Sequence, residues 1–162
     1  MKVSFGKGRN KLRLFKPLVT EVIQNLLSDS DFKEHSIHVN FVELDDRELG
    51  NVTLEVAQSP KITLNLDVNG SPYLWCKALC HEITHVMQIA SGRMEAISSS
   101  CIVFDGEFYI PAEHPREWMQ TDAPWEVEAY AAQDLLYSKL KEGLTGKRVQ
   151  LGALVVEYED IL

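Results

Sequence analysis

Hydrophobic and polar residues alternate with two different periods in the first half of the chain, and each period predicts a different element. Apolar residues recur every three or four positions after Pro17, which predicts a helix that ends near residues 28–31. Apolar and polar residues then alternate in shorter runs, which predict β-strands separated by turn-forming residues. The predicted strands cover residues 36–44, 52–56 and 61–68.

A longer run of helical periodicity begins at Pro72 and ends at about Ala90. Ser71 is placed to cap this helix, Pro72 suits its first position, and Gly92 is a natural stop after its last turn. Because a helix and three strands precede it, we expect one α+β domain with a small, mostly antiparallel sheet.

The segment after this helix contains a clear turn signal. Asp105-Gly106 suits a tight type I′ turn, so residues 101–104 and 107–110 are predicted to form a β-hairpin. Residues 111–121 show no helical or strand periodicity and are interpreted as irregular.

A last helix is predicted near the C-terminal end of the chain. Asp122 is placed to cap it, and Pro124 falls in its first turn. The helical pattern runs to about Lys141, so we expect the helix to end before Gly143.

The long helix contains the sequence His81-Glu82-Ile83-Thr84-His85, which has the HExxH pattern. Residues four apart lie one above the other on a helix, so His81 and His85 can bind one metal ion from the same side. Glu82 lies about 100° around the helix from His81. It is poorly placed to be a ligand, but it can act as a general base on a water molecule whose pKa zinc lowers to about 7.

The alternative interpretation is an amphipathic helix whose two histidines have no chemical role. A helical wheel argues against it, because both histidines lie outside the apolar arc and roughly opposite its centre. Two histidines on a separate face, with an acid between them, favour a metal site. The apolar arc consists of Trp75, Cys76, Leu79, Cys80, Ile83, Val86, Met87 and Ala90.

A catalytic zinc site usually has three protein ligands, so the HExxH pair needs one more donor. Glu126 is the preferred candidate, because it shares a helix face with Ala129, whose small side chain allows two helices to approach closely. Glu128 is the second candidate, and His114 is another. Both glutamates would also suit the first turn of a helix for purely electrostatic reasons.

Composition narrows the classes of function. The 162 residues carry a net charge of −8, and 45% of them are hydrophobic and 25% charged. This balance is ordinary for a globular protein and argues against a general nucleic-acid or membrane-surface binder. The first sixteen residues contain six basic and no acidic side chains. They could contact phosphate, but a solvated strand or arm is the preferred interpretation.

The chain shows no signal for a membrane or an oxidising compartment. No apolar run is long enough to span a bilayer, and the N-terminal segment MKVSFGKGRNKLRLF lacks the apolar core of a signal peptide. The three cysteines have no disulfide spacing, and Cys76 and Cys80 fall on the apolar arc. We therefore expect a cytoplasmic protein with reduced thiols, in which these two cysteines do not bind metal.

The HExxH motif followed by Glu126-x-x-Ala129 resembles the gluzincin branch of the zincin metallopeptidases, which join HExxH to a later Glu-x-x-small pattern. Tyr130 stands where these families often have Asp or Asn. Residues 72–135 also resemble small, uncharacterised metallopeptidase-like proteins of bacteria and bacteriophages. The resemblance implies a minimal zincin fold, with an antiparallel strand beside the cleft that can bind an extended substrate.

We therefore expect a zinc-dependent metallopeptidase acting on protein or peptide substrates, with zinc held by His81, His85 and Glu126 and with Glu82 as general base. The oxyanion formed during hydrolysis would need a second hydrogen-bond donor. Two alternative functions are a zinc-binding structural or protein-interaction module without turnover, and a DNA-associated protease. Another divalent metal could also occupy this ligand set. The candidate oxyanion donors are Tyr109, His114, Tyr130 and Tyr137.

Overall fold

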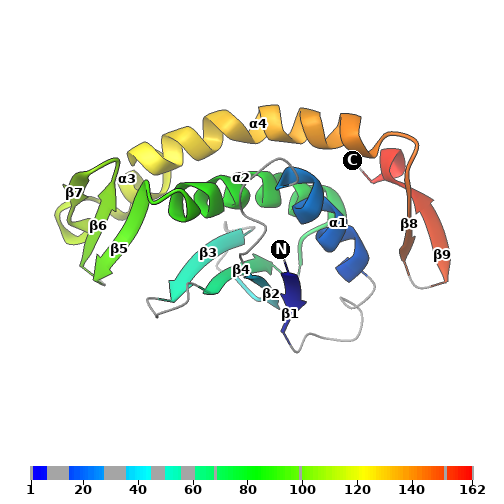
Figure 1. Cartoon of the computed structure of the whole chain (residues 1–162), viewed down its shortest axis with the longest axis horizontal. Coiled ribbons are helices and arrows are strands. Elements are labelled where there is room, and N and C mark those ends of the chain that lie inside the picture. Colours follow the sequence, from blue (N-terminus) through cyan, green and yellow to red (C-terminus); the bar gives the residue numbers. More distant parts are fainter. Residues whose placement is uncertain are drawn as a thin grey trace.

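The computed structural model describes residues 2–6, 15–27, 36–44, 50–55, 61–67, 69–98, 100–151 and 153–161. Helix α2 (Pro72–Ala90) lies between a four-stranded sheet and a second long helix, α4 (Pro124–Leu144), as Figure 1 shows. Helix α1 (Lys16–Leu26) packs beside α2. The fold class is α+β, and α2 lies at its centre.

The four-stranded sheet combines parallel and antiparallel pairing. β1, β2 and β4 run parallel, and β3 pairs antiparallel with β4 at the edge of the sheet. The prediction of a mostly antiparallel sheet is therefore wrong for this sheet, although the three predicted strands are confirmed in position. The spatial order is β1-β2-β4-β3, formed by β1 (Lys2–Phe5), β2 (Ser36–Val42), β4 (Lys61–Asp67) and β3 (Gly50–Glu55).

The connectivity of the chain explains the parallel pairing. Helix α1 connects β1 to β2, and helical crossovers of this kind join strands that run in the same direction. β3 pairs with the outer side of β4, so β4 comes to lie beside β2 and parallel to it. Alternating apolar residues indicate which side of a strand is buried, but they do not indicate which strand lies next to it.

The main core lies between the sheet and the helices. Apolar residues at every second strand position point into it, as the alternation predicted. The sheet contributes Ile37, Val39, Ile62, Leu64 and Leu66, all 0% exposed. The predicted apolar faces of the helices meet them there, with Leu18, Val19, Val22 and Ile23 from α1 and Trp75, Cys76, Leu79, Cys80, Ile83 and Val86 from α2.

Helix α2 begins and ends where the sequence predicts. The Ser71 side-chain oxygen accepts a hydrogen bond from the backbone N–H of Leu74 at 3.3 Å, and Pro72 occupies the first turn. Gly92 follows the last turn with a φ of 72°, a backbone conformation that glycine adopts without strain.

A second, antiparallel sheet follows α2. It consists of β5 (Met94–Ser98), β6 (Cys101–Phe104) and β7 (Glu107–Tyr109), in that order. The predicted hairpin is confirmed, because Asp105 and Gly106 have φ values of 50° and 85°, which suit a type I′ turn. β5 was not predicted, and it adds a second strand to the other side of β6.

The segment between β7 and α4 is not irregular as predicted. It forms a 3₁₀ turn, η3 (Pro111–Glu113), and a short helix, α3 (Arg116–Thr121). A helix of this length is too short to show periodicity. Asp122 is the C-terminal cap residue of α3, so its predicted role as the cap of α4 is wrong. Helix α4 instead begins after Ala123, without a side-chain cap among the described residues.

Helix α4 continues beyond its predicted end. It passes through Gly143 and reaches Leu144, whereas the sequence predicted an end near Lys141. A Cβ atom on Gly143 would lie 2.8 Å from Asn25 Oδ1 in α1. The glycine is therefore an element of close packing between α4 and α1, and the helix-stop interpretation of it is wrong.

A C-terminal hairpin, which was not predicted, follows α4. It consists of β8 (Arg148–Leu151) and β9 (Leu154–Glu157), and the 3₁₀ turn η4 (Tyr158–Asp160) comes after it. Val149 and Tyr158 are 5% and 2% exposed and belong to the main core. The hairpin thus packs on the end of α4 that is far from the HExxH motif (Figure 1).

Two sequence interpretations are only partly covered by the structure. Most of the basic N-terminal segment, residues 7–14, lies outside the described residues. No helix in the described parts of the chain is long and apolar enough to cross a membrane.

Candidate metal centre

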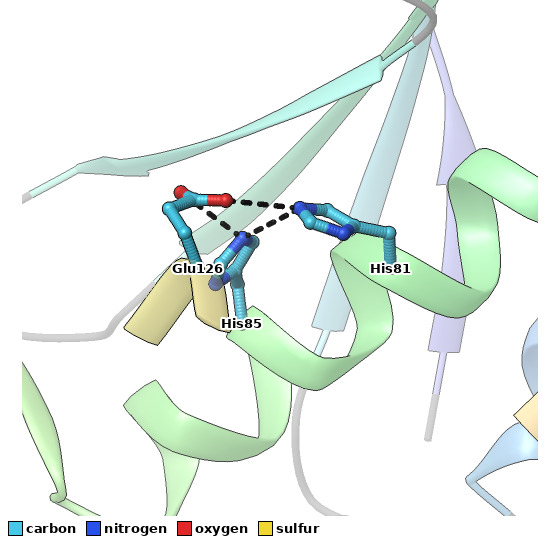
Figure 2. A group of neighbouring side chains, drawn as sticks. All are labelled: His81, His85 and Glu126. Carbon is cyan, nitrogen blue, oxygen red and sulfur yellow. Dashed lines mark hydrogen bonds and ion pairs between the residues drawn. The ribbon is translucent and has the colours of Figure 1, made fainter. Parts of the chain in front are cut away.

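Three side chains from two helices converge on one point of the molecule. His81 and His85 come from successive turns of α2, and Glu126 comes from the first turn of α4 (Figure 2). Glu126 Oε2 lies 3.1 Å from His81 Nε2, and Glu126 Oε1 lies 3.5 Å from His85 Nε2. The two Nε2 atoms lie 3.2 Å apart. The structure thus brings together the three residues that the sequence predicted as ligands.

The ligand atoms of these three side chains lie within 4.8 Å of one another, close enough to share one metal ion. Zinc binds imidazole nitrogen and carboxylate oxygen at about 2.0–2.1 Å, so two ligand atoms at a tetrahedral angle lie about 3.3–3.4 Å apart. The observed separations of 3.1, 3.2 and 3.5 Å lie near this distance, with a different carboxylate oxygen of Glu126 facing each histidine. Two imidazoles and one carboxylate are also a donor set of catalytic zinc sites. The three side chains therefore fit a zinc ion by both chemistry and spacing.

The structure places the two alternative third ligands elsewhere. The carboxylate of Glu128 accepts hydrogen bonds from both terminal nitrogens of Arg93, at 2.8 and 2.7 Å. His114 stacks on Trp118 with a ring-centroid distance of 3.9 Å. Neither belongs to the group of side chains that could share one metal ion, so Glu126 remains the candidate.

Packing around the first turn of α4 positions Glu126. Trp125, the preceding residue, is 2% exposed and belongs to a second apolar cluster with Phe104 and Ala123. Ala129, one turn later, is 0% exposed, and α4 packs on α2. A larger side chain at this buried position would disturb the packing of α4 and with it the placement of Glu126.

The charges in this cluster are coupled. Burial alone would raise the pKa of Glu126, but hydrogen bonds with His81 and His85 and the charges of these histidines lower it to about 2. Burial opposes protonation of His85, but the hydrogen bond and charge of Glu126, together with the charge of Glu82, raise the pKa of His85. Without metal, the anionic carboxylate therefore favours a proton on His85, and a divalent cation must displace that proton.

This coupling predicts how stability depends on pH with and without zinc. The raised pKa of His85 stabilises the metal-free protein below the ordinary value of 6.5, and this contribution is lost as the pH rises through the folded-state pKa. The lowered pKa of Glu126 stabilises it above the ordinary value of 4.5, and this contribution is lost as the pH falls toward 2. The affinity for zinc has the opposite pH dependence: it increases as the pH rises, because zinc binds the neutral imidazole of His85.

We therefore expect the increase in unfolding temperature caused by zinc to grow as the pH rises from about 6 to about 8, the range in which histidine loses its proton. Thermal unfolding with excess zinc and with excess chelator, at several pH values, measures this difference. A zinc effect that is independent of pH over this range would contradict the ligand assignment of His85.

Glu82 is buried beside the cluster and is separate from it. Its exposed fraction is 6%, and it lines the same cleft as His81, His85 and Glu126. Strand β3 passes close to it, because a Cβ atom on Gly50 would lie 3.3 Å from Glu82 Cγ. Glycine at the first position of β3 thus allows the edge strand to run directly against the side chain of Glu82.

An open cleft with a volume of about 1170 Å³ leads to these four side chains. Its wall on the side of the four-stranded sheet is formed by the edge strand, through Gly50, Asn51 and Val52. Another part of the wall is apolar and is formed by Ile89, Met94, Ala96 and Ile102, from the end of α2 and from β5 and β6. The cleft therefore combines a strand edge, an apolar surface and the converging polar residues.

Four residues were predicted as possible oxyanion donors. Of these, Tyr130 is the one among the described lining residues of the cleft. Its ring centroid lies 4.6 Å from that of His81, and the residue is 51% exposed. Burial and the nearby carboxylates raise the pKa of Tyr130, so its hydroxyl remains a hydrogen-bond donor at neutral pH. Tyr109 instead donates to Glu107 at 2.9 Å, and Tyr137 packs edge-on against another tyrosine.

Two of the three cysteines lie in the main core, as the apolar arc predicted. Cys76 and Cys80 are both 0% exposed, and burial raises the pKa of each thiol to about 12. A thiol with such a pKa stays protonated at neutral pH, and metals bind the thiolate. Their role is therefore packing.

Comparisons with protein-family models, with curated proteins and with solved structures find no match for this chain.

Two residues of the site were not predicted. Gln88 contacts His85 and the start of α4, and Gly50 contacts Glu82. The available signal for Gln88 was its position three residues after His85, which places both on one side of the helix. Gly50 lies in the turn predicted between the strands at residues 36–44 and 52–56. Its sequence neighbours contain no sign that the edge of a strand passes α2 at this position.

Proposed function

We propose that this protein is a zinc-dependent metallopeptidase with a minimal zincin-like fold. The observation that carries the proposal is the convergence of His81, His85 and Glu126, whose ligand atoms lie within 4.8 Å of one another, with Glu82 buried beside them in one cleft. The arrangement of elements supports it as well. Helix α2 carries HExxH next to an antiparallel edge strand, and a later helix supplies the glutamate.

Zinc bound by these three residues would supply a Lewis acid that activates water and polarises a carbonyl group. The donor set also accepts other divalent metals. We propose zinc because two imidazoles and one carboxylate form a ligand set of catalytic zinc sites.

Glu82 is the proposed general base. Its carboxylate would accept a proton from the attacking water and deliver that proton to the leaving amine. Its place in the cleft, beside the ligands and not among them, suits this role. The hydroxyl of Tyr130 is the proposed hydrogen-bond donor to the developing oxyanion, because it is held next to His81 and stays protonated.

The walls of the cleft suggest an extended peptide as the substrate. β3 lies at the edge of its sheet, and its first residues line the cleft, so a substrate backbone can pair with it as an added strand. The apolar wall formed by Ile89, Met94, Ala96 and Ile102 would accept an apolar side chain next to the scissile bond. An unfolded segment presents both features, whereas a folded domain hides them.

The proposal is tested by metal analysis and a cleavage assay on the same preparation. We expect about one zinc ion per chain in the purified protein and almost none in His81→Ala, because a site with two ligands left binds weakly. We also expect the parent protein, and not the variant, to cleave a mixed peptide library or a denatured protein. Zinc without any cleavage would favour a zinc-binding interaction module, and absence of zinc binding would overturn the proposal.

A further inference from the structure

The side chain of Gln88 is buried between the two helices that form the metal centre. It is 1% exposed and lies on α2, three residues after His85. A buried primary amide is costly unless its oxygen and nitrogen find partners. Both partners of Gln88 belong to the metal centre or its immediate support.

The first partner is His85 and the second is the start of α4. His85 Nδ1 lies 2.9 Å from Gln88 Oε1, and Gln88 Nε2 donates a hydrogen bond to the backbone carbonyl of Trp125 at 3.0 Å. Trp125 directly precedes Glu126 in the chain. One amide thus connects His85, the second histidine of the HExxH motif, with the backbone next to the third ligand.

This arrangement also defines the orientation of the amide and the tautomer of His85. A backbone carbonyl can only accept, so the Gln88 atom facing Trp125 must be the NH₂ group. The oxygen of Gln88 then faces His85, and Nδ1 of His85 must carry the hydrogen. When His85 is neutral, its Nε2 lone pair is therefore directed toward His81 and Glu126, as a metal ligand requires.

The other histidine has no comparable support. His81 Nδ1 is buried, and it has no hydrogen-bond partner among the described residues. Its ring contacts the ring of Tyr130, which can hold its plane by packing but cannot accept a hydrogen bond at Nδ1 in the manner of a carboxylate or amide oxygen. Among the described residues, a hydrogen bond at Nδ1 therefore orients the ring of His85 but not that of His81.

We propose that Gln88 is the positioning residue of the metal centre. It fixes the ring orientation and tautomer of His85 and, through the Trp125 carbonyl, holds the first turn of α4 so that Glu126 meets the histidines. The inference rests on the proposed zinc site but concerns a residue that does not touch the metal. Outer partners of this kind typically contribute about 10–100-fold to metal affinity.

The test compares Gln88→Met with Thr84→Val. Methionine matches the length of glutamine but cannot form either hydrogen bond. Thr84 is the matched control, because it is 2% exposed on the same helix and its hydroxyl donates to the backbone carbonyl of Cys80 within α2. We expect Gln88→Met to bind zinc about 10–100-fold more weakly than the parent protein in a chelator competition, and Thr84→Val to bind it as the parent protein does.

Nitrogen-edited NMR of the zinc-loaded protein supplies a readout that a general loss of packing would not change. The Nδ1–H proton of His85 should give a slowly exchanging signal in the parent protein and in Thr84→Val. That signal should be lost, or exchange rapidly, in Gln88→Met, because the proton no longer has a buried acceptor.

Gln88→Glu is the second variant, and it keeps the test decisive if Gln88→Met does not fold. A glutamate retains an acceptor for His85 Nδ1, so it should preserve the Nδ1–H signal and more zinc affinity than methionine does. Equal zinc affinity of Gln88→Met and the parent protein would overturn the inference, as would an equal loss in Thr84→Val or loss of the Nδ1–H signal in zinc-loaded Gln88→Glu. A parent protein that binds no zinc would instead overturn the proposed function.

Discussion

The Glu82→Gln variant is expected to fold, to bind zinc as the parent protein does and to lose nearly all peptide hydrolysis. Glutamine has the size and hydrogen-bonding reach of glutamate, so it can fill the same buried position beside β3. It cannot accept a proton. Loss of a general base typically costs about 10²–10⁴ in rate, so the effect on turnover should far exceed any effect on stability.

Zinc content, thermal unfolding and cleavage of a fluorogenic peptide, measured on one preparation, separate these effects. Glu128→Gln is the matched control, because Glu128 is a carboxylate near the metal centre that is engaged by Arg93 outside the cleft. It should retain the turnover of the parent protein. Unchanged hydrolysis in Glu82→Gln would mean that another base takes the proton. Lost zinc in that variant would mean that Glu82 is a ligand or a structural support.

The convergence of His81, His85 and Glu126 could be predicted from the sequence to a large extent because helix geometry is local. His81 and His85 face one way because they are four residues apart, whatever the rest of the chain does. The choice of Glu126 over Glu128 also followed from a helix face, which carries Ala129 at its centre. The structure brings Glu126 to the histidines and pairs Glu128 with an arginine.

The pairing of strands could not be predicted in the same way. The alternation in residues 36–44 and 61–68 correctly indicated the buried side of each strand. The alternation contains no information on which strands become neighbours in the sheet. The edge position of β3, which determines what lies beside Glu82, is set by this choice.

Short elements were missed for a related reason. Helix α3 and strand β5 are too short for their periodicity to be distinguished from a loop. Asp122 was interpreted as the start of α4 because a capping residue and a following proline suit a helix start. In the structure α3 ends at Thr121 with Asp122 as its C-cap, and α4 begins at Pro124 without a side-chain cap among the described residues.

The burial of α2 has a consequence for the site that periodicity did not reveal. The sequence separates an apolar face from a face with the histidines, which suggests one buried and one open side. In the structure both faces are covered, since His81, Glu82, His85 and Gln88 are all less than 10% exposed. The polar residues are therefore desolvated, and their interactions with one another are stronger than they would be at an open surface.

The Glu126→Ala variant is expected to lose zinc binding, with affinity reduced by more than the roughly 100-fold upper range for residues that only support a ligand. The carboxylate of Glu126 reaches both histidines, at 3.1 and 3.5 Å, and it supplies the negative charge that lowers the cost of placing a cation there. Alanine removes both the donor atom and the charge. Glu128→Ala should change zinc affinity little, because it breaks only a partly exposed ion pair with Arg93.

Glu126→Gln refines this prediction, because it keeps a donor oxygen but removes the charge. Its zinc affinity should fall between those of the parent protein and Glu126→Ala. Chelator competition at one pH, with zinc content checked after gel filtration, ranks the variants. The assignment is wrong if Glu128→Ala loses the metal while Glu126→Ala retains it. If both variants retain it, two histidines and some other group must hold the ion, and the meeting of α2 with the first turn of α4 would need a different explanation.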